Sequence, residues 1–432
     1  MICENLSVNA DGILLFGGAN TVEMIKKYGS PLYLMDERRL RHNCRVYVES
    51  MKKYFGDDAL PLYASKANSF KQIYRIIASE GMGTDVVSSG ELYTAKSAGF
   101  PLEKAYFHSN NKTDADISYA IDCGIGYFVA DNEEEICAIN RFAKEKGIVQ
   151  KILLRLTPGI DPHTYEAVAT GKVDSKFGSA IVTGEAERVT RIALSKENID
   201  LCGFHCHVGS QVFDSEVYLA AAQIMLSFIA DMKKKYSFDT KQLNLGGGYG
   251  VRYTEKDPVI DIAENIKLVA ETLKKLCEEL GITLPAIRME PGRSIVADAG
   301  ITLYTAGSVK RIPEYKNYVS VDGGMPDNPR FALYQSSYTV LLANKMNEKN
   351  DFLCSVVGRC CESGDILQEN VYLPSSVCRG DIVAVLTTGA YNYSMASNYN
   401  RIPRLPTVMI DGDRDYVAVR RESLEDIARN DM

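Results

Sequence analysis

The sequence lacks the features that would point to a membrane or a nucleic acid. No apolar run in its 432 residues approaches the roughly 20 residues that a membrane-spanning helix needs. The opening stretch MICENLSVNADGILLFGG has neither a basic segment nor a long apolar core, so it does not resemble a secretory signal peptide. No basic block stands out, and 56 acidic residues outnumber 49 basic ones. We therefore expect no membrane and no nucleic acid as partner.

Disulfide and structural zinc patterns are absent as well. The 11 cysteines are odd in number, scattered, and without CxxC spacing, which favours a reducing cytoplasm and predicts no metal site. The composition, 46% hydrophobic and 24% charged, is typical of a globular protein with enough chain for two domains.

What is present, from residue 60 onward, is a regular alternation of short apolar runs with stretches of helical spacing. Eight such alternations predict a parallel (β/α)8 barrel of the TIM type, with a doubly wound open sheet as the alternative. The runs are residues 60–66, 83–88, 104–109, 126–131, 151–156, 201–208, 242–248 and 286–292.

Polar residues at the ends of these runs favour the barrel. In a barrel the carboxyl ends of all strands meet on one face, which carries the active site, whereas an open sheet would disperse them. The residues at these ends are Lys66, Asp85, His108, Asp131, Arg155, His207, Gly246, Gly247, Gly248 and Glu290.

A second domain follows. After about residue 296 the β-type runs are joined by turns with little helical spacing, which predicts a mostly antiparallel sandwich or barrel. The first 31 residues are also β-like. We therefore predict a barrel domain over 32–295 and a β domain over 1–31 and 296–432, closed by a short helix within 422–430.

Three motifs carry candidate chemistry in the barrel domain. NLGGGYG (244–250) can bring backbone N–H groups close to a phosphate, or can be only a tight turn. In FHCHVGSQ (204–211) we expect His205 and His207 to face opposite ways, so that one stacks on a planar ligand or is a core histidine. In MEPGRS (289–294) Glu290 can pair with a protonated ring nitrogen and Arg293 with a carboxylate, or the two can form a salt-bridged turn.

Two further motifs lie in the β domain. GRCCESGDIL (358–367) offers a cysteine that is either a proton donor or packing. TTGAYNYSMASNYN (387–400) is dense in tyrosine and asparagine, which either bind a ligand or fill a domain interface. Taken with Lys66, the glycine turn, the acid and the histidine, the set fits pyridoxal 5′-phosphate: a lysine for the Schiff base, glycines for the phosphate, and an acid for the ring nitrogen.

The whole set of motifs resembles the fold-type III pyridoxal-phosphate-dependent decarboxylases, with an alanine racemase-like barrel, and most closely the diaminopimelate decarboxylase branch. The combination of EPGRSIVADAG, DSKFG and CESGD is similar to this branch rather than to ornithine or arginine decarboxylases. The matching stretches keep the family's order over nearly the whole chain: YASKANS, FHSNNKT, TGKVDSKFG, FHCHVGSQ, NLGGGYG, EPGRSIVADAG, VDGGMPDNPRFALY, CCESGD and GAYNYSMASNYN. One departure is NPRFALY, where the proline precedes the arginine.

The resemblance implies a role for each motif residue. Lys66 forms the Schiff base and Cys361 is the proton donor, the two catalytic residues. Cys361 and Glu362 are supplied across a homodimer interface. Cofactor contacts are implied for Lys66, Asp85, Arg155, His207, Ser210, Gly246, Gly247, Gly248, Glu290, Gly292, Arg293 and Tyr391. Substrate contacts are implied for Arg293, Arg330, Tyr334, Glu362 and Tyr391.

The implied reaction is decarboxylation of meso-2,6-diaminopimelate to L-lysine and CO2, the last step of lysine biosynthesis. A decarboxylase of ornithine, arginine or lysine is the alternative, but those substrates lack the distal carboxylate that Arg293 and Arg330 would bind. An alanine racemase, which uses an arginine at the ring nitrogen, fits Glu290 less well. A catalytically silent relative that only binds the cofactor is the alternative outside enzymes.

Overall fold

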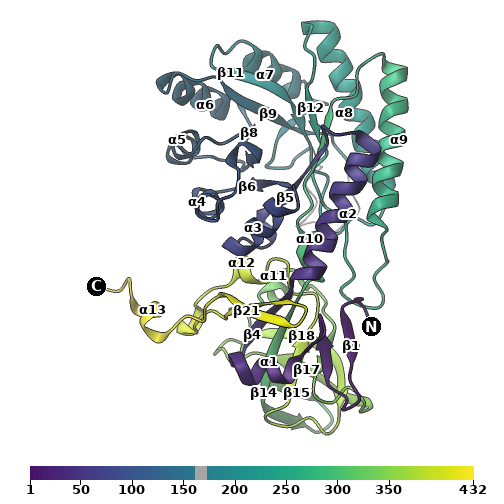
Figure 1. Ribbon diagram of the computed structural model, residues 1–432, viewed down its shortest axis with the longest axis vertical. Helices are drawn as coiled ribbons and strands as arrows, with labels where there is room; N and C mark the ends of the chain where they lie inside the picture. The colour runs from purple at the N-terminus through teal and green to yellow at the C-terminus, as the bar shows by residue number, and fades with distance from the viewer. Residues whose placement is uncertain (161–172) are drawn as a thin grey trace. The chain divides into compact units, whose positions relative to one another are not determined.

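The computed structural model describes residues 1–160 and 173–432 and divides the chain into two compact units (Figure 1). The barrel unit comprises Asn43–Gly250 and Ile260–Ser294, and the β unit comprises Met1–His42, Val251–Val259 and Ile295–Met432. The first residues of the stretch TGKVDSKFG (170–178) lie outside the described residues. Among the helices described, none combines the length and the apolar character needed to cross a membrane.

The barrel unit contains a closed sheet of eight parallel strands. Each strand pairs in parallel with the next, and both β13–β5 and β8–β9 pair, which closes the sheet. The prediction of a (β/α)8 barrel is confirmed, and the open sheet is wrong. In sequence order the strands are β5 (Leu60–Ala64), β6 (Gly83–Val86), β7 (Ala105–Phe107), β8 (Tyr127–Ala130), β9 (Gln150–Thr157), β11 (Ile199–His205), β12 (Gln242–Asn244) and β13 (Ala286–Met289), with the short β10 (Ser179–Ala180) beside β9.

Helices surround these strands (Figure 1). In α9 (Ile262–Leu280), Asp261 caps the start by accepting from the backbone N–H of Glu264 at 3.0 Å, and Gly281 ends the helix at a left-handed φ of 63°. The other helices are α3 (Lys71–Ser79), α4 (Ser89–Ser97), α5 (Asp114–Asp122), α6 (Glu133–Glu145), α7 (Glu185–Leu194) and α8 (Ser215–Tyr236), together with the part of α2 (Glu37–Phe55) from residue 43 onward.

The interior of the barrel is packed rather than hollow. One layer is a cluster from five strands, in which every side chain is at most 2% exposed: Leu62, Tyr106, Val129, Leu153 and Cys202. A packed interior leaves the carboxyl ends of the strands as the place where polar side chains can gather.

The β unit is built around one nine-stranded sheet. Most pairings are antiparallel, as predicted, and two are parallel, β15–β17 and β20–β4. Its strands are β4 (Leu32–Asp36), β14 (Gly300–Ile312), β15 (Lys316–Val321), β16 (Val340–Leu342), β17 (Asn350–Val357), β18 (Ile366–Pro374), β19 (Ile382–Val385), β20 (Thr407–Asp411) and β21 (Arg414–Val419). The predicted closing helix is present as α13 (Leu424–Ala428).

The N-terminal segment packs into the core of this unit. The strands β1 (Leu6–Val8), β2 (Leu14–Phe16) and β3 (Ala19–Asn20) form a small separate sheet, followed by α1 (Thr21–Tyr28). Leu14 and Phe16 are fully buried in one apolar cluster with Ile301 and Val408.

The unit boundaries differ from the predicted ones. The barrel was expected to start at residue 32, but β4 pairs with β14 and β20, so residues 32–42 belong to the β unit. Residues 251–259 also belong there. All five residues of β4 are buried. Such an apolar run has the same pattern as a barrel strand, and its partners lie more than 250 residues away in the sequence.

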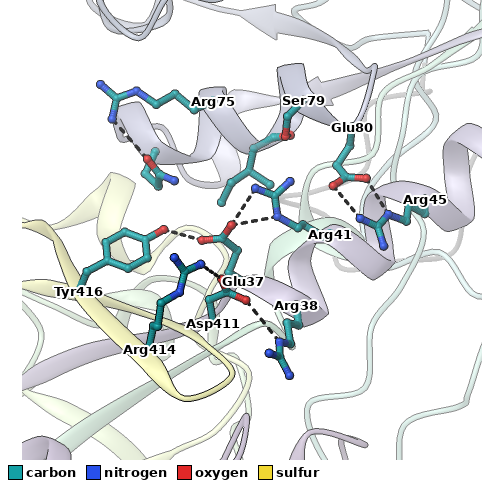
Figure 2. A network of polar contacts seen from close by, with 12 residues as sticks. Glu37, Arg38, Arg41, Arg45, Arg75, Ser79, Glu80, Asp411, Arg414 and Tyr416 are labelled. Atoms are coloured by element: carbon teal, nitrogen blue, oxygen red, sulfur yellow. Dashed lines mark hydrogen bonds and ion pairs between the residues drawn. The ribbon is translucent and has the colours of Figure 1, made fainter.

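Within the β unit, polar contacts fix the start of α2 (Figure 2). Tyr416 donates to one carboxylate oxygen of Glu37 at 2.5 Å, and Arg41 donates to the other from two nitrogens at 2.7 and 2.9 Å. Within the barrel unit, Arg45 further along α2 binds both oxygens of Glu80 at 2.8 and 3.1 Å. In the β unit Tyr416 therefore anchors the start of this helix, and in the barrel unit the bidentate pair of Arg45 with Glu80 anchors its middle.

Candidate active site

Lys66 stands where β5 ends. The chain enters a single 3₁₀ turn, Ser65–Ala67, in which both neighbours of the lysine are fully buried while the lysine side chain is exposed. The backbone N–H of Ser65 donates to Asp85 at 3.2 Å, and its hydroxyl donates to Glu91 at 2.9 Å. The turn is thereby fixed, and it presents one amine at the carboxyl end of the barrel.

Glu290 follows the last residue of β13 and is buried among side chains from three other strand ends. Asn244 donates to its Oε1 at 2.7 Å, His108 Nε2 lies 2.7 Å from the same oxygen, and His205 Nε2 lies 3.1 Å from Oε2. Burial alone would raise the pKa of Glu290, but the neighbouring His108 and His205 hold it well below its usual range. Burial lowers the pKa of both histidines, that of His205 to about 4. Near neutral pH the group is a carboxylate between two neutral imidazoles.

Both histidines of FHCHVGSQ face this end of the barrel. His205 contacts Glu290, and the Nδ1 atom of His207 accepts from the backbone N–H of Gly247 at 3.3 Å. The expectation that they face opposite ways is therefore wrong. Side chains alternate along a strand, so residues two apart share a face.

The glycine turn after β12 leaves no room for side chains. A Cβ atom on Gly247 would lie 1.9 Å from the carbonyl oxygen of Glu290, and one on Gly248 would lie 2.1 Å from that of Gly209. Gly246 and Gly248 have φ of 69° and 112°, which favour glycine. The turn is a narrow cradle of backbone, as a phosphate site requires.

Beside this turn Arg293 donates from Nη2 to the hydroxyl of Ser210 at 2.8 Å. Gly292, just before it, could carry no side chain freely, because a Cβ there would lie 2.8 Å from that of Ala64 at the end of β5. The two motifs FHCHVGSQ and MEPGRS thus meet, and both predicted phosphate-side residues, Ser210 and Arg293, are in contact.

Asp85 and Arg155 occupy two further strand ends. Burial, and then the charge of Glu290, raise the pKa of Asp85 well above its usual range, while Lys66 acts in the opposite direction. The guanidinium of Arg155 lies 4.3 Å from the centre of the Phe177 ring. Asp85 is therefore an acid that keeps its proton to higher pH than an exposed aspartate does.

Sequence reasoning missed Asn244 and a buried ion pair. Lys112 donates to Glu135 at 2.9 Å and to the carbonyl oxygens of Ser109 and Val129 at 2.9 and 2.7 Å. The signal for Asn244 was its place as the last residue of an apolar run before the glycines. Lys112 lies in the quoted stretch FHSNNKT, but its partner is 23 residues further along.

These residues fit pyridoxal 5′-phosphate. An exposed amine, a buried carboxylate anion and a glycine turn closed to side chains lie at one end of one barrel. The amine suits the aldehyde, the carboxylate suits a protonated ring nitrogen, and the turn suits the phosphate.

Comparison with known proteins agrees with the geometry. The family described as pyridoxal-dependent decarboxylase, pyridoxal binding domain, matches residues 41–297. The diaminopimelate decarboxylase of Bacillus subtilis is 43% identical over 424 residues, which cover 98% of this chain and 96% of that protein. The crystal structure of diaminopimelate decarboxylase from M. jannaschii in complex with L-lysine is similar at a TM-score of 0.91 and 31% identity, covering 99% of this chain and 98% of that one.

The chain belongs to the diaminopimelate decarboxylase family. It is a pyridoxal-phosphate-dependent decarboxylase, and pyridoxal 5′-phosphate is its cofactor. The likeness extends over both units, because the aligned residues cover almost the whole chain.

The remaining predicted site residues lie in the β unit. Arg330 opens α11 (Arg330–Tyr334), is 6% exposed, and donates to the hydroxyls of Tyr338 and Tyr253 at 2.8 and 3.2 Å. Its guanidinium also lies 5.4 Å from the centre of the Tyr391 ring. Two residues predicted for substrate, Arg330 and Tyr391, are therefore neighbours, and Tyr334 is half-buried at the end of the same short helix.

Cys361 and Glu362 lie in an exposed loop between β17 and β18. The backbone N–H of Cys361 donates to the side chain of Asn400 at 2.9 Å, and Glu362 accepts from the backbone N–H of Gly364 at 3.1 Å. All 11 cysteines are free thiols. The loop thus presents a thiol and a carboxylate on the surface of the β unit.

Proposed function

We propose that this enzyme decarboxylates meso-2,6-diaminopimelate and releases L-lysine and CO2 in the cytoplasm, as the last step of lysine biosynthesis. Its curated relatives named diaminopimelate decarboxylase, at 36–44% identity, support the proposal. The lysine in the M. jannaschii complex supports it too, because lysine is the expected product.

The observation that carries the substrate choice is the charge of Arg330. Among the described residues this buried guanidinium has only tyrosine hydroxyls and rings as partners, and no carboxylate pairs with it. A buried cation without a counter-charge is costly. A substrate carboxylate would supply the missing partner, and diaminopimelate retains such a group after losing CO2, whereas ornithine, arginine and lysine have none to spare.

The roles of the barrel residues follow their chemistry. When bound, pyridoxal 5′-phosphate supplies the electron sink that loss of CO2 needs. Lys66 is the amine that binds it, and Glu290 is the anion for its ring nitrogen. His207, Asp85 and Arg155 would hold the ring from the neighbouring strand ends. The phosphate is held by Ser210, Gly246, Gly247, Gly248, Gly292 and Arg293.

The roles of the β-unit residues follow from exposure and charge. Arg330 binds the distal carboxylate with Arg293 and Tyr334, and Tyr391 closes over cofactor and substrate. Cys361 donates a proton to the carbon that has lost CO2, and Glu362 binds substrate beside it. Because both residues are exposed, we propose that they complete the site of a second subunit in a homodimer.

The test is CO2 release by the cofactor-loaded protein with meso-diaminopimelate, lysine, ornithine and arginine in parallel. Turnover of meso-diaminopimelate, with lysine as product, is expected. An Arg330→Met variant should raise the KM for meso-diaminopimelate about ten- to a hundredfold, because a charge-assisted contact is worth about 1.5–3 kcal/mol. Turnover of ornithine or arginine by the wild type, with an unchanged KM in the variant, would overturn the proposal.

A further inference from the structure

The carboxylate of Glu290 is surrounded by polar side chains. Three side chains from three strand ends, those of His108, His205 and Asn244, contact its two oxygens at 2.7–3.1 Å. All four residues are buried, and the two imidazole rings meet edge to face at 4.8 Å between centroids. The carboxylate is fixed from several sides and cannot turn without breaking these contacts.

The protonation of the two histidines decides what they do there. A neutral imidazole has one N–H, so each histidine that donates from Nε2 leaves Nδ1 without a proton. The buried Nδ1 atom of His205 has no hydrogen-bond partner within the described ranges. A proton on this atom would be a buried donor without an acceptor, which is unfavourable. The geometry therefore favours the neutral form that the lowered pKa of His205 also indicates.

The other ionisable groups around Glu290 are consistent with this state. The pKa of Asp85 is raised, chiefly by burial, and Cys206 is a buried thiol whose pKa burial raises to about 12. Arg155 is a cation whose charge opposes protonation of both histidines. The groups that act on Glu290 from the surrounding strand ends are Asp85, His108, Arg155, His205, Cys206 and His207.

We infer that His108 and His205 are positioning residues which, as neutral rings, keep Glu290 ionised and aimed without cancelling its charge: His205 donates to it from Nε2, and His108 lies against its other oxygen. This inference rests on the proposed role of Glu290 toward the ring nitrogen. Two imidazolium ions would neutralise the carboxylate and compete with the protonated ring for it. Neutral N–H donors stabilise the anion and leave its full charge for the cofactor. His108 and His205 touch Glu290, and their effect on the reaction is through it.

The first test reads the two rings in the wild-type holoenzyme. Nitrogen-15 NMR of the histidine side chains should show His108 and His205 neutral, with His205 protonated on Nε2, from pH 6 to pH 8. Imidazolium signals in this range would overturn the inference. This result does not depend on the substrate, so it stands apart from a failure to turn over meso-diaminopimelate.

The second test compares His205→Leu, which removes the donor, with His205→Gln, which can keep one. In the leucine variant the acid limb of the kcat profile, and the pH at which the visible absorption of the bound cofactor changes, should move up by about one pH unit or more. The value of kcat near neutral pH should fall about ten- to a hundredfold with little change in KM, which is the effect of losing one hydrogen bond to a charge. The glutamine variant should recover most of this loss, and His42→Leu, at an exposed histidine, should change nothing.

Equal pH profiles and equal spectra in the leucine variant and the wild type would overturn the inference. His108, His205 and Glu290 are also metal-ligand types whose ligand atoms lie within 4.8 Å of one another. Metal analysis is therefore the third readout. One zinc ion per holoenzyme chain, lost in His205→Leu, would also overturn the inference, because the three residues would then be a metal site.

Discussion

The two units hold their candidate site residues by different means. In the barrel unit, charged groups are buried against other side chains: Glu290, after β13, lies between His108 and His205, and Lys112, in the loop after β7, lies against Glu135 of α6. In the β unit the candidate residues lie on loops, as Cys361 and Glu362 do, or on the short helix α11, as Arg330 and Tyr334 do. These loops are joined by side chains that accept from backbone N–H groups.

Asp365 connects two loops of the β unit through hydrogen bonds to their backbones. It is 3% exposed, and its two oxygens accept from the backbone N–H groups of Met325 at 2.6 Å and Cys360 at 2.7 Å. Met325 lies on the loop that leads to Arg330, and Cys360 precedes Cys361. A Cβ on Gly324 or Gly358 would lie 2.5 or 2.3 Å from this carboxylate, so both loops approach it closely.

This difference predicts different consequences of substitution. Changes in the barrel unit should alter charge and cofactor chemistry. Changes at residues that connect loops of the β unit, such as Asp365, should alter the position of a loop and leave the cofactor in place. The following experiments test this contrast, from the largest expected effect to the smallest.

The largest effect is expected for Lys66→Ala. Removing the only group proposed to bind the cofactor covalently should lower turnover by roughly 10³-fold or more and abolish the visible absorption of lysine-bound cofactor. Absorption spectra and CO2 release measure both. Lys71→Ala, at an exposed lysine five residues away, is the matched control and should behave like the wild type. Normal activity of Lys66→Ala would refute the assignment of the lysine.

Asp365→Ala should have the next largest effect, and this effect should be on stability and loop position rather than on cofactor chemistry. It leaves two backbone N–H groups without their acceptor, which should lower the free energy of unfolding by about 2–5 kcal/mol. It should also lower kcat/KM while the cofactor spectrum stays unchanged. Urea unfolding and steady-state kinetics measure the two effects. Glu369→Ala, which removes only a partly exposed ion pair with Lys316, is the control. Equal effects of the two substitutions would show that Asp365 does not hold the two loops in place.

Contacts between residues far apart in the chain are what the sequence could not predict. The eight apolar runs, and the polar residues at their ends, follow from local patterns that a strand imposes. That His108, His205 and Asn244 converge on Glu290 depends on the register among β7, β11, β12 and β13, which are far apart in the chain. The prediction that residues 32–36 belong to the barrel domain failed for the same reason. The motif containing Asp365 was recognised, but nothing local tells which backbone groups a carboxylate will reach.

Asp327 should make the stability of the β unit depend on pH. It is buried, Tyr304 and the backbone N–H of Gly324 donate to it, and burial raises its pKa to about 7. The pKa of Asp327 in the folded protein lies above the unfolded value of about 3.9, so protonation of Asp327 stabilises the folded state. This stabilisation is complete below about pH 4 and is lost as the pH rises through about 7. At about 1.4 kcal/mol for each tenfold change in proton affinity, the full difference is roughly 4 kcal/mol.

Urea unfolding at pH 5 and pH 8 should show about 2.7 kcal/mol of this difference, because only the titration between pH 5 and about pH 7 falls in this range. The wild type should lose stability between the two, relative to Asp327→Asn, which has no group to titrate there. Parallel behaviour of wild type and variant would show that another group controls the β unit in this range. The barrel residues give the contrasting case, since the low pKa of Glu290 makes its contribution fall only when the pH falls.

The smallest effect is expected at Asn400, and it sharpens the contrast most. Its side chain accepts from the backbone N–H of Cys361 at 2.9 Å, and its own backbone is left-handed, with φ 51° and ψ 23°. Glycine and aspartate both tolerate this conformation, but only aspartate keeps an acceptor. Asn400→Gly should therefore lower kcat for meso-diaminopimelate about two- to tenfold, the worth of one ordinary hydrogen bond, while Asn400→Asp stays near the wild type. Because Asn400 anchors the loop and not the cofactor, both variants should keep the wild-type absorption spectrum. Equal kcat values in the two variants would mean that the position of the Cys361 thiol does not depend on this contact. A changed spectrum would mean that a substitution in this loop alters the cofactor, which contradicts the proposed difference between the two units.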